Sequence, residues 1–175
     1  WCVRKCPYCD FNSYEARGAL PDLDYVEALL RDLRTEAPLA QNRVVDTVFL
    51  GGGTPSLFSG EAIDRLLAGL RAEIDLSPAA EITLEANPGS VEAERFKGYR
   101  AAGVSRVSMG LQSLRDEELK KLGRIHTVAE AKAALAIARN TFERFSFDLI
   151  YARPRQTADD WRAELAEALD MAGDH

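Results

Sequence analysis

Val44-Val-Asp-Thr-Val-Phe-Leu50, followed at once by Gly51-Gly-Gly-Thr-Pro55, is the stretch that decides the fold of this chain. The β-branched and aromatic residues predict a strand over 44–50, and the glycine-rich segment predicts a loop at its carboxyl end. Ser59 then has the position of a helix cap, before an apolar stripe made of Ile63, Leu66, Leu67, Leu70 and Ile74. The stretch therefore predicts a strand, a loop and a helix in succession.

The same alternation continues in both directions. Apolar spacing and capping residues predict helices near 22–37, 59–74, 90–102, 116–122, 127–141 and 157–170, and strands at 44–50, 81–86, 106–111 and 145–151. Alternating strands and helices build a parallel sheet covered by helices, so the fold class is α/β. Since a closed eight-stranded barrel typically needs about 250 residues, four strands indicate a small open sheet or part of a barrel.

Composition limits the possible functions. The chain has 175 residues, of which 46% are hydrophobic and 29% charged, as expected for a globular domain with a sizeable core. A net charge of −6 argues against a general nucleic-acid binder, and small-molecule or protein partners are favoured. No apolar run approaches the roughly 20 residues of a membrane span, so the expected location is the cytoplasm. Trp1 at the start, and an end just after a helix, predict a fragment cut at both ends.

Polar residues and glycines follow each predicted strand. Gly51-Gly-Gly-Thr54 follows the first strand, Glu85-Ala-Asn87-Pro88 the second and Gln112-Ser113 the third, while Asp148 lies near the end of the fourth. Because parallel α/β folds bind ligands at that edge, these positions predict a pocket for a polar organic ligand. Taken singly, each has an ordinary structural explanation: Asn87-Pro88-Gly89 reads as a turn, and His126 as a surface or capping-region side chain.

The three cysteines of the chain, Cys2, Cys6 and Cys9, are spaced C-x3-C-x2-C. Such thiolates can hold three irons of a cubane cluster and leave the fourth iron without a protein ligand. Structural zinc is the main alternative, since Cys6 and Cys9 form a common half-site, but the two histidines, His126 and His175, offer no paired fourth ligand. A catalytic or redox thiol is a further alternative. A disulfide framework is disfavoured by the odd number of cysteines.

The segment Cys2-Val-Arg-Lys-Cys6-Pro-Tyr-Cys9 resembles the signature loop of the radical S-adenosylmethionine (SAM) enzymes. Several further stretches resemble the oxygen-independent coproporphyrinogen III oxidase family within that group: Phe49–Ser56, Leu84–Gly89, Arg106–Ser113, Leu122–Thr127 and Phe147–Tyr151. The resemblance covers almost the whole chain. It implies a partial TIM-like barrel of six β/α units, of which residues 1–175 would form a radical SAM core domain without the first and last strands.

The resemblance also implies the roles of individual residues. Cys2, Cys6 and Cys9 would bind a 4Fe-4S cluster, and SAM would occupy the open iron. Tyr8 would lie beside the adenine, Gly52 and Gly53 would meet the methionine amino group through backbone carbonyls, and Glu85 would meet the ribose hydroxyls. Thr54 would belong to the same cofactor-binding set. Gln112, Arg124 and Asp148 would complete the pocket, where the fork-shaped guanidinium of Arg124 suits a carboxylate. In the family, one electron from the cluster splits SAM into methionine and a 5′-deoxyadenosyl radical.

Two branches of the family have to be separated. Coproporphyrinogen dehydrogenases usually continue the third cysteine as Cys-Gly-Cys, whereas Cys9 is followed by Asp10-Phe11-Asn12. This difference favours the heme-chaperone branch, whose partners would be SAM, heme or a porphyrin, a heme-accepting apoprotein and an electron donor. The alternatives are the dehydrogenase and a non-catalytic zinc or iron-sulfur module. Whether the chain acts as an enzyme stays open. Arg155, where the family usually has glycine, puts the shape of its loop in question.

Overall fold

A computed structural model describes residues 1–173, apart from the side chains of residues 90–93; His175 lies outside the described residues. Helices and strands alternate in the order α1 (Asp22–Glu36), β1 (Val45–Leu50), α2 (Gly60–Glu73), β2 (Leu76–Ala86), α3 (Ser90–Ala102), β3 (Arg106–Gln112), α4 (Asp116–Lys121), α5 (Val128–Thr141), β4 (Arg144–Leu149) and α6 (Ala158–Met171). Two short 3-10 turns, η1 (Ala37–Ala40) and η2 (Pro55–Leu57), were not expected from the sequence.

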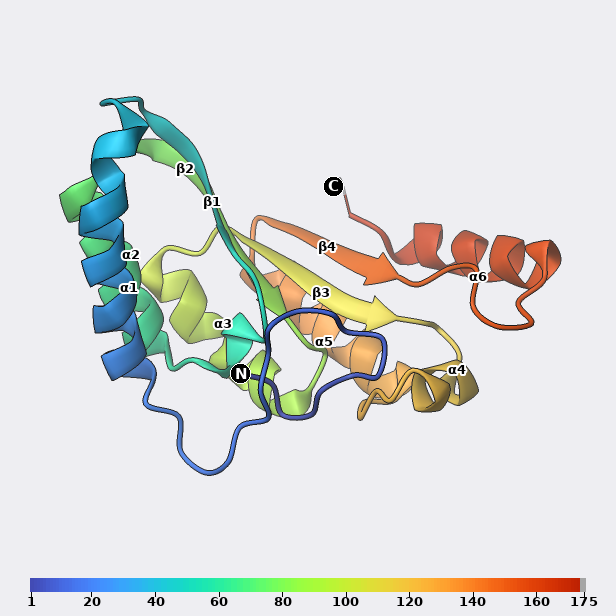
Figure 1. Cartoon of the computed structure of the whole chain (residues 1–175). Coiled ribbons are helices and arrows are strands. Elements are labelled where there is room, and N and C mark those ends of the chain that lie inside the picture. The colour runs from blue at the N-terminus through green and yellow to red at the C-terminus, as the bar shows by residue number, and fades with distance from the viewer. Residues whose placement is uncertain (174–175) are drawn as a thin grey trace.

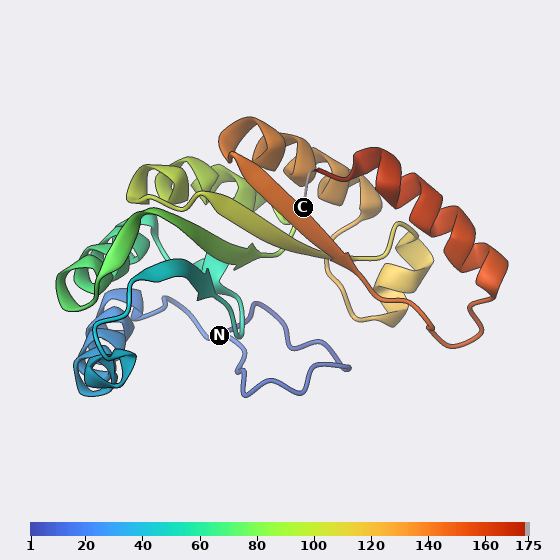
Figure 2. The same ribbon diagram turned by 90° about the horizontal axis from the view of Figure 1, so that it is seen from above.

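The four strands form one parallel sheet in the order β1-β2-β3-β4, which confirms the α/β class. Figure 1 shows the twist of this sheet, and Figure 2 shows the helices ranged along one side of it and the N-terminal loop near the other. β2 begins five residues before the predicted strand because Leu76 pairs with Val45, ahead of a register irregularity. Parallel strands in sequential order place all four carboxyl ends at one edge.

The two faces of the sheet differ in polarity. Along β2 and β3 the residues that face the helices are fully or almost fully buried: Ile82, Leu84, Ala86, Val107, Met109 and Leu111. The alternate positions carry polar side chains, and on this face Arg106 donates to Ser146 Oγ at 2.8 Å and Arg144 donates to Glu81 Oε2 at 2.7 Å. Since side chains alternate along a strand, one face builds the hydrophobic core and the other is a polar surface.

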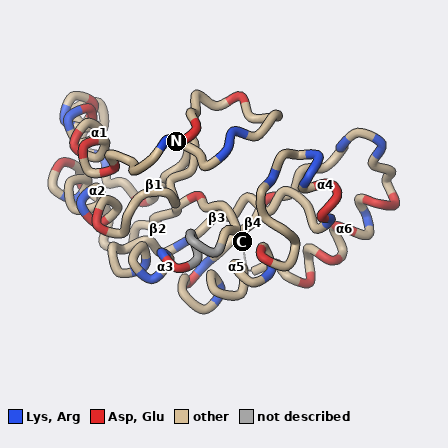
Figure 3. Tube along the Cα trace, turned by 90° about the horizontal axis from the view of Figure 1, so that it is seen from below, with Lys and Arg blue, Asp and Glu red and all other residues tan. Residues whose placement is uncertain are grey.

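Local capping agrees with the sequence. The Ser59 hydroxyl accepts from Ala62 N at 3.1 Å, and both Thr127 with Glu130 and Thr157 with Asp160 form complete capping boxes. Figure 3 shows that acidic and basic residues are interspersed along the helices. No helix in the described part of the chain is long and apolar enough to cross a membrane.

One prediction about the core was wrong. On α6 the helical spacing of Trp161, Leu165 and Leu169 predicts a buried apolar stripe, but Leu165 is 38% and Leu169 is 66% exposed. The buried residues of this helix are Glu164 and Ala168. Glu164 forms an ion pair with the buried Arg153, and this contact turns the side of α6 that carries Glu164 toward the fold.

Candidate cofactor site

The carboxyl edge of the sheet and the N-terminal loop enclose a cavity of about 310 Å³. All of the site residues predicted from the sequence line it: Cys2, Cys6, Tyr8, Cys9, Gly52, Gly53, Thr54, Glu85, Gln112, Arg124 and Asp148. Arg4, Phe11, Asn87, Ser108 and Gly110 belong to the same wall. The fold therefore brings together residues that lie as far apart in the chain as Cys2 and Asp148.

The cysteine loop is held by its backbone. Cys2 N donates to Tyr14 O at 2.9 Å, Ala16 N donates to Cys2 O at 2.8 Å, and Cys9 N donates to Cys6 O at 3.1 Å. The three thiols are free and partly exposed. Among the described residues, no three His, Cys, Asp or Glu side chains already form a set that could hold a metal ion. The loop thus presents three thiols to one cavity without a preformed metal geometry.

The glycine run after β1 allows this loop to approach closely. A Cβ atom at Gly53 would lie 2.6 Å from Trp1 O and 2.9 Å from Trp1 N, so a larger residue would displace the backbone next to Cys2. Gly52 has a φ of 117°, a conformation that favours glycine, and its N–H donates to Glu85 Oε2 at 3.3 Å. The glycine run is therefore required both by the close approach of Trp1 to Gly53 and by the backbone conformation of Gly52.

A chain of hydrogen bonds connects two of the cysteines. Thr54 Oγ1 donates to Cys2 Sγ at 3.5 Å and accepts from Asn87 Nδ2 at 3.1 Å. Arg124 donates to Asn87 Oδ1 at 2.5 Å through Nη2 and to Cys6 Sγ at 3.5 Å through Nη1. From the sequence, Asn87 was grouped with Glu85 among the strand-end positions and was also interpreted as a turn residue, but no partner was predicted for it. Its position at the same strand edge as Glu85 was the available signal, but its two partners depend on the tertiary fold.

Two carboxylates line the cavity, Glu85 from β2 and Asp148 from β4, on either side of β3. Burial raises the pKa of Glu85 above its ordinary value, although the Gly52 N–H opposes this, and burial raises the pKa of Asp148 in the same way against the pull of Arg106. Within the described chain, neither carboxylate forms an ion pair with a lysine or arginine. Both can accept hydrogen bonds from the hydroxyl or ammonium groups of a ligand.

Tyr8, within the cysteine loop, and Arg124, which contacts Cys6 of that loop, line the same cavity. Burial raises the pKa of Tyr8 to about 12, while the Arg124 guanidinium acts in the opposite direction. The Nε atom of Arg124 is buried without a hydrogen-bond partner among the described residues. An unsatisfied buried donor of this kind indicates a place for an acceptor group, such as a ligand carboxylate.

These observations test whether the residues fit an iron-sulfur cluster with an organic ligand. Thr54 and Arg124 direct donors at two of the sulfurs, and such hydrogen bonds to the sulfur ligands are typical of iron-sulfur sites. The cavity offers a cation with one donor that has no partner among the described residues, together with two carboxylates that form no ion pair within that part of the chain. This set suits a ligand carrying carboxylate, ammonium and hydroxyl groups. The donor set therefore fits both groups that the resemblance implies.

His126 departs from its prediction. Only 7% of the side chain is exposed, and Nε2 lies 3.2 Å from Leu111 O at the end of β3. Burial, aided by the positive charge of Arg124, lowers the pKa of His126 to about 4. The neutral ring donates from Nε2 to this carbonyl. His126 is therefore a buried contact of β3, because the chain folds back after α4. Of the two places expected for it, the surface is wrong, whereas the capping region is confirmed, since His126 directly precedes the N-cap residue Thr127.

The loop that contains Arg155 keeps a tight turn. Gln156 N donates to Arg153 O at 3.0 Å, Pro154 follows Arg153, and Arg155 takes a φ of 65°. This is the position where such turns favour glycine. The arginine thus adopts the left-handed conformation that a glycine adopts more easily.

Three comparisons with known proteins agree that this chain is related to radical SAM proteins. The chain matches the Radical SAM superfamily over residues 1–168. The heme chaperone HemW of Escherichia coli is 50% identical over 176 residues, which cover all of this chain and 47% of the relative. The mitochondrial radical S-adenosyl methionine domain-containing protein 1 of Mus musculus is 40% identical over 176 residues, 40% of its length. The chain thus spans about half the length, or less, of these relatives.

A solved structure gives the same result for the fold. The coproporphyrinogen III oxidase HemN of Escherichia coli, described as a radical SAM enzyme, superimposes with a TM-score of 0.85 at 30% identity, over 99% of this chain and 40% of that one. The sequence match and the common fold establish that this chain belongs to the radical SAM superfamily, whose membership implies a 4Fe-4S cluster and SAM.

Proposed function

We propose that this chain is the cluster- and SAM-binding part of a heme chaperone, which binds heme and transfers it to an apoprotein. The observation that carries the proposal is the common cavity, which is lined by three thiols, two carboxylates and a cation, Arg124, one of whose donors has no partner among the described residues. The 50% identity to HemW of Escherichia coli over the whole chain supports the choice of a chaperone, as does the sequence Cys9-Asp10-Phe11-Asn12.

In this proposal Cys2, Cys6 and Cys9 hold the cluster, and the neighbouring side chains hold SAM. Arg124 pairs with the ligand carboxylate, because its buried Nε has no partner among the described residues. Glu85 accepts from the ribose hydroxyls, Tyr8 lies beside the adenine, and the backbone of Gly52 and Gly53 meets the ammonium. Gln112, Thr54 and Asp148 complete the wall. When bound, the cluster would supply one-electron chemistry at SAM.

The second candidate is an oxygen-independent coproporphyrinogen III dehydrogenase. It is favoured by one observation, the TM-score of 0.85 against HemN. To separate the two functions, we would incubate the full-length, anaerobically reconstituted protein with coproporphyrinogen, SAM and a reductant. We expect stable heme binding and no decarboxylated product. Formation of that product would exclude the chaperone as the main function.

The assigned ligands are tested by SAM titration. We expect Glu85→Gln and Asp148→Asn to weaken SAM binding about tenfold or more, since each removes a charged hydrogen-bond acceptor. Glu81→Gln is the matched control, because Glu81 lies on β2 with Glu85 but pairs with Arg144 and does not line the cavity. A triple Cys→Ala variant should lose the iron. An unchanged iron content, or wild-type protein that takes up zinc and binds no SAM, would favour the non-catalytic module.

A further inference from the structure

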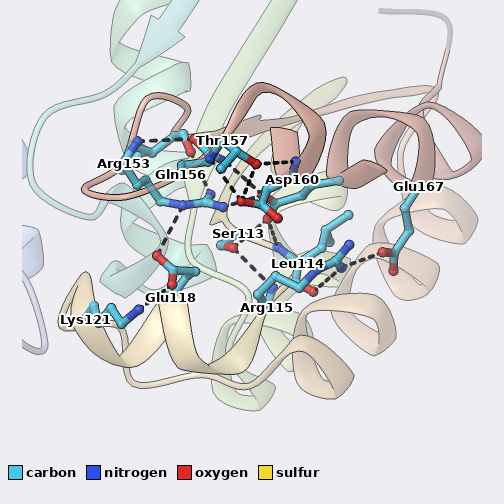
Figure 4. Close-up of polar contacts among 12 residues, drawn as sticks. Ser113, Leu114, Arg115, Glu118, Lys121, Arg153, Gln156, Thr157, Asp160 and Glu167 are labelled. Carbon is cyan, nitrogen blue, oxygen red and sulfur yellow. Dashed lines mark hydrogen bonds and ion pairs between the residues drawn. The ribbon is translucent and has the colours of Figure 1, made fainter. Parts of the chain in front are cut away.

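A buried ion pair joins the segment after β4 to helix α6. Arg153 follows β4, Glu164 lies in the middle of α6, and their side chains are 4% and 1% exposed. Arg153 Nη2 donates to Glu164 Oε2, and neither residue lines the cavity. Figure 4 shows the contacts that surround the pair, between the ends of β3 and β4 and helices α4 and α6.

The pair closes a ring of contacts. Glu164 Oε1 accepts from Ser113 Oγ at 2.6 Å and from Leu114 N at 2.7 Å, directly after β3. Arg153 Nη1 donates to Ile150 O at 2.7 Å, directly after β4. Ile150 N in turn donates to Gln112 O at 2.9 Å. The ring thus runs from Gln112 through Ile150, Arg153 and Glu164, and returns along the backbone of Ser113.

Gln112, which is part of this ring, has an unfavourable backbone conformation. Its φ is 71°, in the left-handed region that non-glycine residues rarely adopt, and it lies at a register irregularity between β3 and β4. Such a conformation persists only where the surroundings over-determine it. The side chain of Gln112 lies against Gly110, where a Cβ atom would be 2.7 Å from Nε2. In this conformation of the strand end, Gln112 lines the cavity.

An ion pair buried in this way is weak evidence for stability, since an apolar pair of similar volume often stabilises a fold as well. An apolar pair has no directional contacts, however. Glu164 accepts from Ser113 and Leu114, and the hydrogen bonds and attraction from these groups and from Arg153 outweigh its burial and lower its pKa. The charged pair therefore adds directional hydrogen bonds that hold the end of β3, through Ser113 and Leu114, and the end of β4, through Ile150, in one relative position.

We propose that Arg153 and Glu164 are positioning residues for the SAM pocket, which tie the ends of β3 and β4 together so that Gln112 and Asp148 keep their places in the cavity wall. The inference rests on the proposed SAM site. It assigns a role to two residues that contact neither the ligand nor the cluster, and it predicts that removal of their charge weakens SAM binding more than it changes cluster content.

The test compares Glu164→Gln with Glu167→Gln in the full-length, reconstituted protein. Glu167 is also on α6, but it forms exposed ion pairs with Arg115 and Lys132 at 2.6 and 2.9 Å. By calorimetric titration we expect Glu164→Gln to weaken SAM binding about tenfold with unchanged iron per chain, and Glu167→Gln to change it less than twofold. Hydrogen exchange should become faster around Leu114 and Ile150 in Glu164→Gln only.

A double variant, Arg153→Met with Glu164→Leu, separates positioning from stability. The apolar pair restores packing, so we expect folding with a similar melting temperature but a SAM affinity still about tenfold below wild type. Recovery of the wild-type affinity would overturn the proposal. If Glu164→Gln does not fold, Ser113→Ala keeps the ion pair and removes one contact to it, and we expect roughly threefold weaker binding; no change would overturn the proposal.

The wild-type titration distinguishes failure of the SAM site from failure of the positioning role. Wild-type protein that holds its cluster but binds no SAM would refute the proposed site, and the positioning role with it. Wild-type and Glu164→Gln proteins that bind SAM equally well would refute the positioning role alone.

Discussion

Gly53→Ala should disturb the cofactor site through a single methyl group. The new Cβ atom would lie 2.6 Å from Trp1 O and 2.9 Å from Trp1 N, whereas ordinary contacts begin at 3.4 Å. Both neighbours are backbone atoms, so Trp1 would have to move by roughly 0.8 Å. Trp1 is fixed on its other side by Tyr25, with ring centroids 4.9 Å apart. The displacement therefore passes to Cys2, whose amide and thiol are both hydrogen-bonded.

We expect this overpacking to lower the free energy of unfolding by about 1–3 kcal/mol and, in the full-length protein, to reduce the iron bound per chain after anaerobic reconstitution. Iron analysis and the absorbance of the cluster measure the second effect, and thermal unfolding measures the first. Gly18→Ala is the control, because Gly18 has a φ of 84° and an added methyl group there would meet no atom within 4 Å, so it adds strain without a clash. Full iron content in Gly53→Ala would refute this reasoning.

Three further variants test the hydrogen-bond chain, the buried histidine and the strained turn. Asn87→Ala should lower the free energy of unfolding by about 2–4 kcal/mol, since it removes one neutral and one charged hydrogen bond. It should also alter the cluster's reduction potential in a redox titration. An unchanged potential would show that the hydrogen-bond chain does not reach the cysteines. The buried His126, with a pKa of about 4 against an ordinary 6.5, binds a proton less readily when folded, so the free energy of unfolding should fall by about 3 kcal/mol between pH 6.5 and pH 4. Denaturant titrations should show a smaller loss over this range in His126→Gln, and equal losses would contradict the assignment. Arg155→Gly should raise the free energy of unfolding by up to about 1 kcal/mol by relieving a φ of 65°, and a lower denaturation midpoint would argue against strain at this turn.

Much of the fold was predictable because its signals are local. The run Val44–Leu50 and the capping boxes at Thr127 and Thr157 specify their elements through backbone propensities and neighbouring side chains, and the structure confirms them. Parallel connections then place the strand ends at one edge, which is why Glu85, Gln112 and Asp148 could be grouped from the sequence alone.

The errors concern residues whose environment depends on distant parts of the chain. The apolar stripe of Trp161, Leu165 and Leu169 has helical spacing, but spacing alone does not reveal which side of a helix meets the fold. The buried pair of Arg153 and Glu164 decides this. His126 is buried because its partner, Leu111 O, lies at the end of β3, on the other side of α4.

The sequence by itself determined the α/β class, the three-cysteine loop and the polar residues at the strand ends, because these depend on periodicity, spacing and residue chemistry. Tyr8 and Arg124 were assigned to the cavity only through the resemblance to a known family. Only the tertiary structure decided how those residues are held. It places Asn87 between Thr54 and Arg124, and it closes the ring around Gln112. Hydrogen bonds and buried ion pairs act over about 3 Å and in fixed directions, so their partners are defined only when segments far apart in the chain have packed together.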